Sequence, residues 1–130
     1  AYNTLVNNAR KTADPAVRMK YMMDAEKLLI DDMPFIPLYH RSYTLMVSPK
    51  LKNEGYIVAN NAIGTYYIEL NITNKAFEDK RVRQALSLAI DRNYLVKNVT
   101  KGGQVPAGAF VPTEVRGLNS TFRKENKEYI

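Results

Sequence analysis

The stretch GTYYIELNITNKAFEDKRVRQALSLAIDR, residues 64–92, carries the two patterns that decide the fold class. Its first part, residues 65–72, is rich in aromatic and β-branched residues, which is typical of a β-strand. Apolar residues in its second part recur at the spacing of one helix face: Val82, Ala85, Leu86, Ala89 and Ile90. The sequence therefore predicts a strand followed by a helix whose apolar stripe packs inward. The basic residues of this helix are expected to lie in water: Lys80, Arg81 and Arg83.

A second short helix is predicted directly after the first. Asp91 is well placed to cap it, because a carboxylate can accept hydrogen bonds from the free N–H groups of a helix start. Two short helices rich in basic residues raise the question of a DNA-binding helix-turn-helix. In that motif the second helix must reach bases and phosphates, but here most of the basic residues lie on the first. Only three residues, without a glycine, separate the two apolar patterns, so we expect a packing unit.

The composition is that of a folded globular chain: 45% of its 130 residues are apolar and 25% are charged. It contains no run of roughly 18 apolar residues of the kind that spans a membrane. The net charge of +6 is diffuse, because residues 1–53 carry eight basic and five acidic residues and residues 54–130 carry eleven and eight. Such an even excess favours solubility over a dedicated anionic partner. The first residues lack the apolar core of a signal peptide, so for an exported parent we expect a mature form or a fragment.

The N-terminal third is predicted to be helical. Asp14 and Pro15 suit the cap and the first position of a long helix. The side of this helix that we expect to be buried is rich in methionine: Met19, Met22, Met23, Leu29, Ile30 and Met33. Methionines in this number fit either an adaptable ligand groove or a flexible core. We favour the core.

An extended run follows at residues 35–48, and Pro34 and Pro37 remove two donors from its ladder. This predicts an edge or crossover strand. The polar stretch at residues 48–55 is predicted to be a linker. The Pro/Gly-rich stretch from residue 104 requires another surface to order it, and the tail RKENKEYI, residues 123–130, is expected to be solvated and frayed.

No set of residues in the sequence fits an enzyme. The chain has no cysteine and a single histidine, His40, without a recognisable nucleophile motif or second metal ligand. The carboxylate pairs at residues 31–32 and 78–79 are adjacent, so on a helix they diverge by about 100° and cannot share one proton. We therefore expect no catalysis, no metal and no cofactor.

Aromatic residues on the two extended segments are the best candidates for ligand contact: Tyr39, Tyr43, Tyr66 and Tyr67, with His40 beside them. Tyrosine hydroxyls on rigid strands suit a polar ligand. The alternative is that these side chains only pack and hydrogen-bond within a sheet.

Two long motifs resemble one family. The hallmarks TYYIELN, AFEDKRVRQALSLAIDR and KGGQVPAGAFVP, within residues 64–112, resemble the central segment of the oligopeptide- and dipeptide-binding proteins of ABC importers, extracellular solute-binding protein family 5. ADPAVRMKYMMDAEKLLIDDMPFIPLYHRSYTLMVSP, residues 13–49, resembles their C-terminal part. Family members are several times longer, and here the two motifs stand in inverted order. We therefore expect a fragment with permuted segments, residues 1–53 and residues 54–130, folded as one compact domain.

The resemblance implies an α/β fold, a mixed sheet with flanking helices that forms part of one lobe of a periplasmic-binding-protein-like fold. It implies a peptide-binding component of an ABC importer, periplasmic or a cell-surface lipoprotein in the parent, with short peptides and the transporter permease as partners. The residues implied at the ligand are Tyr39, His40, Tyr43, Tyr66 and Tyr67. The alternatives are a recombined or engineered scaffold that binds nothing and a basic nucleic-acid-binding domain. Strands left exposed in a fragment also predict a homodimer or domain swap.

Overall fold

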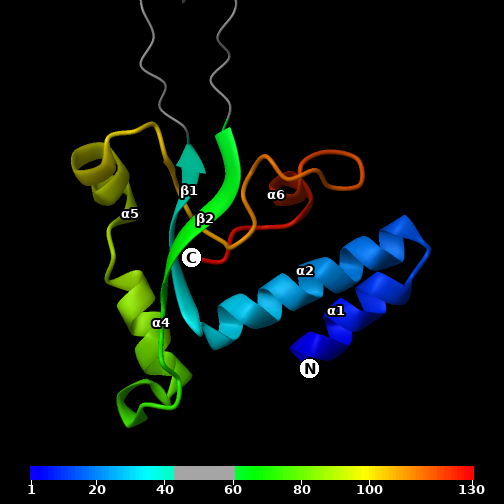
Figure 1. The fold of residues 1–130 in the computed structure, drawn as a ribbon, viewed down its shortest axis with the longest axis horizontal. Coiled ribbons are helices and arrows are strands. Elements are labelled where there is room, and N and C mark those ends of the chain that lie inside the picture. The colour runs from blue at the N-terminus through cyan, green and yellow to red at the C-terminus, as the bar shows by residue number, and fades with distance from the viewer. Residues whose placement is uncertain (43–60) are drawn as a thin grey trace, which may run out of the picture.

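A computed structural model describes residues 1–42 and 61–130, with only the backbone of Asn61, as a small sheet flanked by helices (Figure 1). The sheet has the order β2-β1-β3 and is formed by β1 (Phe35–Ser42), β2 (Asn61–Glu69) and β3 (Val105–Pro106). Both neighbours of β1 run antiparallel to it. The predicted fold class, α/β with helices around a sheet, is confirmed.

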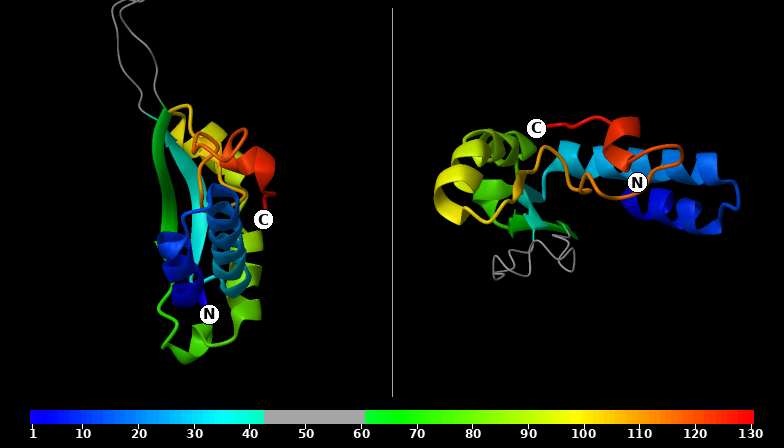
Figure 2. Two further views of the ribbon diagram at one scale, coloured as in Figure 1. Left: turned by 90° about the vertical axis from the view of Figure 1, so that its right-hand side faces the viewer. Right: turned by 90° about the horizontal axis from the view of Figure 1, so that it is seen from above.

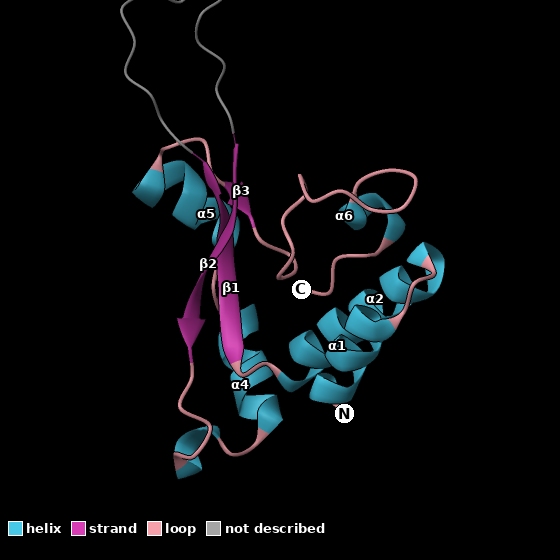
Figure 3. Cartoon of the chain, turned by 45° about the vertical axis from the view of Figure 1, so that its right-hand side comes forward, coloured by secondary structure: helices cyan, strands magenta, loops and turns pink. Residues whose placement is uncertain are grey.

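The strand β1 lies at the centre of the described sheet (Figure 3). Its register with β2 pairs Phe35 with Glu69 and His40 with Thr65. The run was predicted to begin as an edge or crossover segment, and Phe35–Pro37 do pair with β2 alone, whereas β3 pairs further along, with Tyr39 and His40. The missing donor of Pro37 falls where the register shifts, and its carbonyl accepts a 2.8 Å hydrogen bond from Arg92 Nε. Pro37 thus lies beside the bulge, in the part of β1 that pairs with β2 alone among the described strands.

The helices α1 (Tyr2–Lys11) and α2 (Pro15–Asp32) form a hairpin beside the sheet (Figure 2). Asp14 caps α2 as predicted, since its carboxylate accepts from the N–H groups of residues 16 and 17 at 2.8 and 3.1 Å. Met33 ends the helix in the left-handed conformation, at φ 50°. The predicted buried side is only partly right: Met33 is buried, whereas Met22 is 47% exposed.

The hydrophobic core joins α2 to β1 through Ile30, Met33, Ile36 and Leu38. The C-terminal Tyr129 and Ile130 pack against this cluster, and their N–H groups donate to the Gly108 carbonyl at 2.9 and 3.1 Å. The expectation of a frayed tail was wrong, because these last apolar residues cover part of the core.

Short helices complete the fold: η1, a 3₁₀ turn (Lys75–Phe77), α4 (Lys80–Leu88), α5 (Arg92–Tyr94), a π-helical turn η2 (Leu95–Thr100) and α6 (Phe122–Glu125). Asp91 caps α5 as predicted, accepting from the N–H of Tyr94 at 2.8 Å. Asp79 caps α4 in the same way, 2.9 Å from the N–H of Arg81. Within residues 1–42 and 61–130, no helix is long and apolar enough to cross a membrane.

The orientation of α4 differs from the prediction. Val82 and Leu86, on the apolar stripe, are exposed, whereas Arg83 and Ser87 are buried against the rest of the chain. Both faces have helical periodicity, so the spacing alone does not decide which one turns inward. The face that carries Arg83 turns inward because backbone carbonyls at the end of α2 bind its guanidinium.

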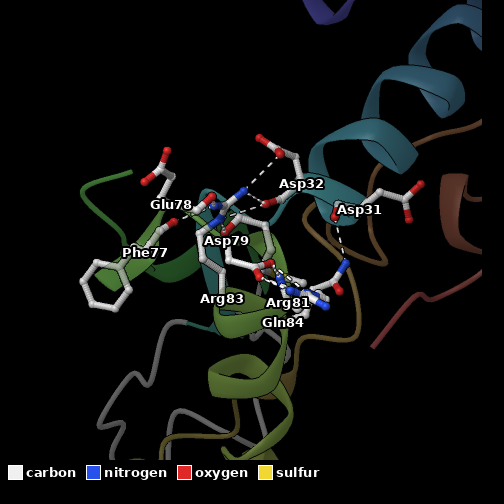
Figure 4. Close-up of polar contacts among 9 residues, drawn as sticks. Asp31, Asp32, Phe77, Glu78, Asp79, Arg81, Arg83 and Gln84 are labelled. Atoms are coloured by element: carbon white, nitrogen blue, oxygen red, sulfur yellow. Dashed lines mark hydrogen bonds and ion pairs between the residues drawn. The ribbon is translucent and has the colours of Figure 1, made fainter. Parts of the chain in front are cut away.

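Arg83 is that anchor, and only 4% of it is exposed (Figure 4). Its Nε and Nη2 donate to the Asp32 carbonyl at 3.0 and 2.6 Å, and its Nη1 donates to the carbonyls of Phe77 and Glu78 at 2.6 and 2.9 Å. Gln84, the next residue, donates to the carbonyl of Asp31 at 2.8 Å. The guanidinium therefore satisfies the otherwise unpaired end of α2. The prediction that Arg83 is solvated was wrong.

Polar contacts also join the two predicted segments on the other side of the sheet. Glu26, buried on α2, accepts from the N–H of Val111 at 2.7 Å, from Asn126 Nδ2 at 3.0 Å and from the buried guanidinium of Arg123. The predicted linker at residues 48–55 and the boundary at residue 53 lie outside the described residues.

Candidate functional site

The register of β1 and β2 places four of the five predicted ligand residues in a small area. Tyr39 pairs with Tyr66, and His40 pairs with Thr65, next to Tyr67. Tyr43 lies outside the described residues. Because successive side chains of a strand point to opposite faces, the sheet separates Tyr39 and Tyr66 from His40 and Tyr67. The sequence predicted the proximity of these residues, but not this division.

On one face, the rings of Tyr39 and Tyr66 stack with centroids 5.1 Å apart and an interplanar angle of 2°. Tyr39 also packs against the hydrophobic core, while Tyr66 is 55% exposed. The partly buried ring of Tyr39 therefore supports the more exposed ring of Tyr66. An aromatic pair of this kind contributes about 0.5–1.5 kcal/mol beyond the area it buries, so Tyr66 offers a preorganised aromatic surface.

On the other face, three aromatic rings form a cluster. Tyr67 lies 5.4 Å from Phe35 and 5.8 Å from Phe110, and the two phenylalanines are 4.6 Å apart. Tyr67 is 45% exposed, so one side of its ring faces solvent. Phe110 was missed in the sequence, since it sits in a Pro/Gly-rich stretch without periodicity. Phe35 belongs to the predicted strand, but only the pairing with β2 brings it to this face.

His40 is the buried member of the set, with 2% of it exposed. Its Nδ1 lies 2.9 Å from Thr65 Oγ1, which donates its only proton to the Phe110 carbonyl at 2.5 Å. Thr65 must therefore accept from His40, so Nδ1 carries the proton and Nε2 the lone pair. Nε2 has no hydrogen-bond partner among the residues that the structure describes. Burial lowers the pKa of His40, although the charge of Glu114 opposes that shift, and the ring is neutral at pH 7.

Among the described residues, no strand covers the outer edge of β2. β2 is the last strand of the described sheet, and Figure 2 shows no described element beyond it. The run NAIGTYYI, residues 61–68, contains neither proline nor charge, the usual protections of an edge strand. Its outward N–H and C=O groups can pair with another extended backbone. Tyr66 and Tyr67 flank this edge on the two faces of the sheet.

The described part of the chain offers no metal-binding chemistry. No group of three or more His, Cys, Asp and Glu side chains is placed to hold an ion within residues 1–42 and 61–130. What these residues present at β2 is an unpaired backbone edge between aromatic side chains. That arrangement can bind an extended polar chain.

Comparison with known proteins agrees with a binding role. The sequence model of the bacterial extracellular solute-binding proteins, family 5 Middle, matches residues 11–129. The oligopeptide-binding protein OppA of Bacillus subtilis is 36% identical over 90 residues, which cover 63% of this chain and 16% of that protein. The periplasmic oligopeptide-binding protein OppA of Haemophilus influenzae is 37% identical over 68 residues, 51% of this chain and 13% of that protein.

A third relative is named for a different ligand. The glutathione-binding protein GsiB of Salmonella typhimurium is 41% identical over 59 residues, which cover 45% of this chain and 12% of that protein. The chain thus spans only 12–16% of the length of these three relatives. No solved structure matches the chain.

Proposed function

Because the chain belongs to the bacterial extracellular solute-binding proteins of family 5, we propose that it is part of the peptide-binding component of an ABC importer. Proteins of this family bind solutes and are not enzymes. Two of the relatives are named as oligopeptide-binding proteins, and the name of the one from Haemophilus influenzae also calls it periplasmic. We place the parent protein outside the cytoplasm, in the periplasm or as a cell-surface lipoprotein, where it delivers short peptides to a permease.

The open edge of β2 carries this proposal. A short peptide that pairs with β2 forms backbone hydrogen bonds, which are independent of its side chains and so allow many sequences. Tyr66 contacts the peptide on one face of the sheet, supported by its stack on Tyr39, and Tyr67 contacts it on the other. His40 acts from inside, because its hydrogen bond to Thr65 holds β2 in place.

The expected affinity is low. Each backbone hydrogen bond contributes roughly 0.5–1.5 kcal/mol net, so four of them contribute about 2–6 kcal/mol before the cost of ordering the peptide. Before that cost, the range corresponds to dissociation constants between about 30 mM and about 40 μM, and ordering the peptide weakens binding further. The resemblance implies that family members enclose the ligand between two lobes, and β2 contacts it from one side.

We also propose that the segments stand in permuted order. Residues 13–49 resemble the family's C-terminal part and residues 64–112 its central part. The pairing of β1 with β2 supports the proposal, because it lets one connection join the two segments within one sheet. A scaffold that folds in this way but binds nothing needs the same pairing, so only a binding experiment distinguishes the two.

The nucleic-acid alternative is weakened by two buried arginines. Arg83 is bonded to carbonyls of α2 and η1, and Arg92 donates to the carbonyls of Pro37 and Ser87, each at 2.8 Å. Neither guanidinium is free to reach a phosphate. This removes two of the cations that favoured a helix-turn-helix in the sequence.

The test is an NMR titration with unlabelled tri- and tetra-alanine. We expect amide shifts confined to residues 61–69, together with weaker binding in Tyr66→Ala and Tyr67→Ala. Tyr94→Ala is the matched control, because Tyr94 is an exposed tyrosine on α5, away from the sheet. Equal weakening by the control removes the tyrosines of β2 from the site. A titration without shifts at millimolar peptide favours the scaffold.

A further inference from the structure

A groove of about 760 Å³ is lined by residues of the α1–α2 hairpin and of the segment 110–122. We propose that this groove binds an amphiphile with an apolar chain and an anionic head, such as an alkyl carboxylate. Its size is within the range of small-molecule sites. Phe110 is the residue that it shares with the aromatic cluster of β2, and none of Tyr39, His40, Tyr66 and Tyr67 lines it.

The apolar chain has a matching surface. The groove is lined by apolar side chains from both helices and from the segment 110–122: Val6, Met19, Met22, Leu29, Val115 and Phe122. Met19 and Met22, one helical turn apart on α2, are thus placed on an open groove rather than in the core that holds Met33. Flexible, polarisable thioethers adapt to apolar chains of different shape.

The anionic head has three cations to bind. Arg10, Arg18 and Arg116 line the groove, and all three are exposed. Arg18 is held in position by donating from Nε and Nη2 to the Thr12 carbonyl at 3.2 and 2.8 Å. The one acid of the lining, Glu26, is paired with Arg123 at its buried end. The lining thus presents three guanidinium groups and no unpaired carboxylate, and guanidinium binds a carboxylate in bidentate fashion.

Other occupants fit less well. A peptide brings as many backbone donors as acceptors, but the lining side chains offer donors, with only the hydroxyl of Tyr2 and the engaged Glu26 as acceptors. A second copy that docked groove to groove would bring three more arginines against these three, which is repulsive. An alkyl carboxylate meets both the apolar lining and the charge.

The resemblance to the family does not imply this groove. The family match begins at residue 11, whereas α1, which forms one wall, runs over Tyr2–Lys11. Tyr2, Val6, Ala9 and Arg10 therefore all line the groove from outside the matched span.

The experiment follows the methionine methyl groups by ¹³C NMR while sodium decanoate is added below its micelle concentration. We expect the signals of Met19 and Met22 to shift, while Met33, in the core, stays unmoved as an internal control. Decyltrimethylammonium carries the same chain with the opposite charge and should bind much more weakly. Added salt should weaken decanoate binding, since the head groups are exposed.

Variants then test the head group. Arg10→Gln and Arg116→Gln should each weaken decanoate binding roughly two- to fivefold, as expected for exposed ion pairs. Lys97→Gln, an exposed cation on η2, should leave it unchanged. The proposal is overturned if decyltrimethylammonium shifts the same methyl groups equally, if Met33 shifts together with Met22, or if Lys97→Gln weakens binding as much as the arginine variants. The head-group comparison uses the unmodified protein, so it stands even where a variant folds poorly.

Discussion

Replacing Arg83 with methionine tests the anchor that orients α4. The substitution keeps an unbranched side chain of similar length but removes every donor. The side chain makes six hydrogen bonds, to the carbonyls of Asp32, Met33, Phe77 and Glu78 and to Asp32 Oδ1, with Asp32 O bound twice. These carbonyls belong to the end of α2 and to the turn before α4, so the substitution frees both at once.

The cost follows from what is left unpaired. Hydrogen bonds to a charged group contribute about 1.5–3 kcal/mol each in isolation, but several of these acceptors lie near the surface and regain water when Arg83 is lost. Removal of the guanidinium also relieves its desolvation. Asp32 is 56% exposed, so Arg83→Met leaves no buried charge behind. Each buried acceptor left without a partner costs about 1–3 kcal/mol, so with one or two such acceptors we expect the free energy of unfolding to fall by about 2–4 kcal/mol. Arg83→Lys keeps the charge but loses the planar guanidinium with its several donors, so we expect its stability to lie between that of the parent and that of Arg83→Met.

Urea unfolding measures the change, with the slope of free energy against denaturant compared between variants to confirm the same transition. Arg81→Met is the matched control, since Arg81 lies two positions before Arg83, is exposed, and hydrogen-bonds through its side chain to Asp79 alone among the described residues. We expect it to leave the midpoint nearly unchanged. If the two substitutions shift the midpoint equally, Arg83 is solvated, as the sequence pattern predicted, and the orientation of α4 has another cause.

Three further predictions follow from single contacts. Burial lowers the pKa of His40 below its unfolded value of about 6.5, so below pH 6.5 the unfolded chain binds more protons than the folded one. The free energy of unfolding should therefore fall as the pH drops from 6.5 through the folded pKa, by at most about 1.4 kcal/mol per pH unit. His40→Asn, which keeps a donor towards Thr65, should remove this dependence in unfolding curves recorded between pH 5 and 7, and a variant as pH-sensitive as the parent would contradict it. Deleting residues 129–130 should lower the melting temperature by several degrees, through about 2 kcal/mol of lost packing and hydrogen bonds, whereas a frayed tail would leave it unchanged. Pairing through the outer edge of β2 should produce a dimer whose share rises with protein concentration in sedimentation. Ile63→Lys should abolish the dimer, whereas Leu88→Lys, at an equally exposed site on α4, should not. A monomer at every concentration would rule the pairing out.

Local structure was predictable because its causes lie within a few residues. Asp14 and Asp91 cap helices through N–H groups two or three positions away, so the sequence contains both partners. The strand β2 was predicted at residues 65–72 and lies at Asn61–Glu69, since β-branched and aromatic residues mark a strand but not its ends. The kinship carried by the motifs at residues 13–49 and 64–112 is likewise confirmed by the family match.

The candidate site was predictable only in part. Tyr39, Tyr66 and Tyr67 were identified because tyrosines on neighbouring extended runs are visible in the sequence. Their division between two faces depends on the register, which shifts at Pro37 and which no local pattern encodes. Phe110 joins the site through a loop whose path is set by the hydrogen bond from Thr65, 45 residues earlier.

By itself, the sequence determined the longer helices, the strands β1 and β2, the caps Asp14 and Asp91 and the family of this protein, because propensity, capping and motif identity are properties of short segments. Tertiary structure alone decided which surfaces are buried. The helix α4 could turn either Val82 or Arg83 inward, and carbonyls about 50 residues away at the end of α2 bind the arginine. In the same way, Met19 and Met22 of α2 line a groove that α1 and residues 110–122 form with that helix. Burial is a property of partners distant in sequence, and so it could not be predicted from the spacing of apolar residues.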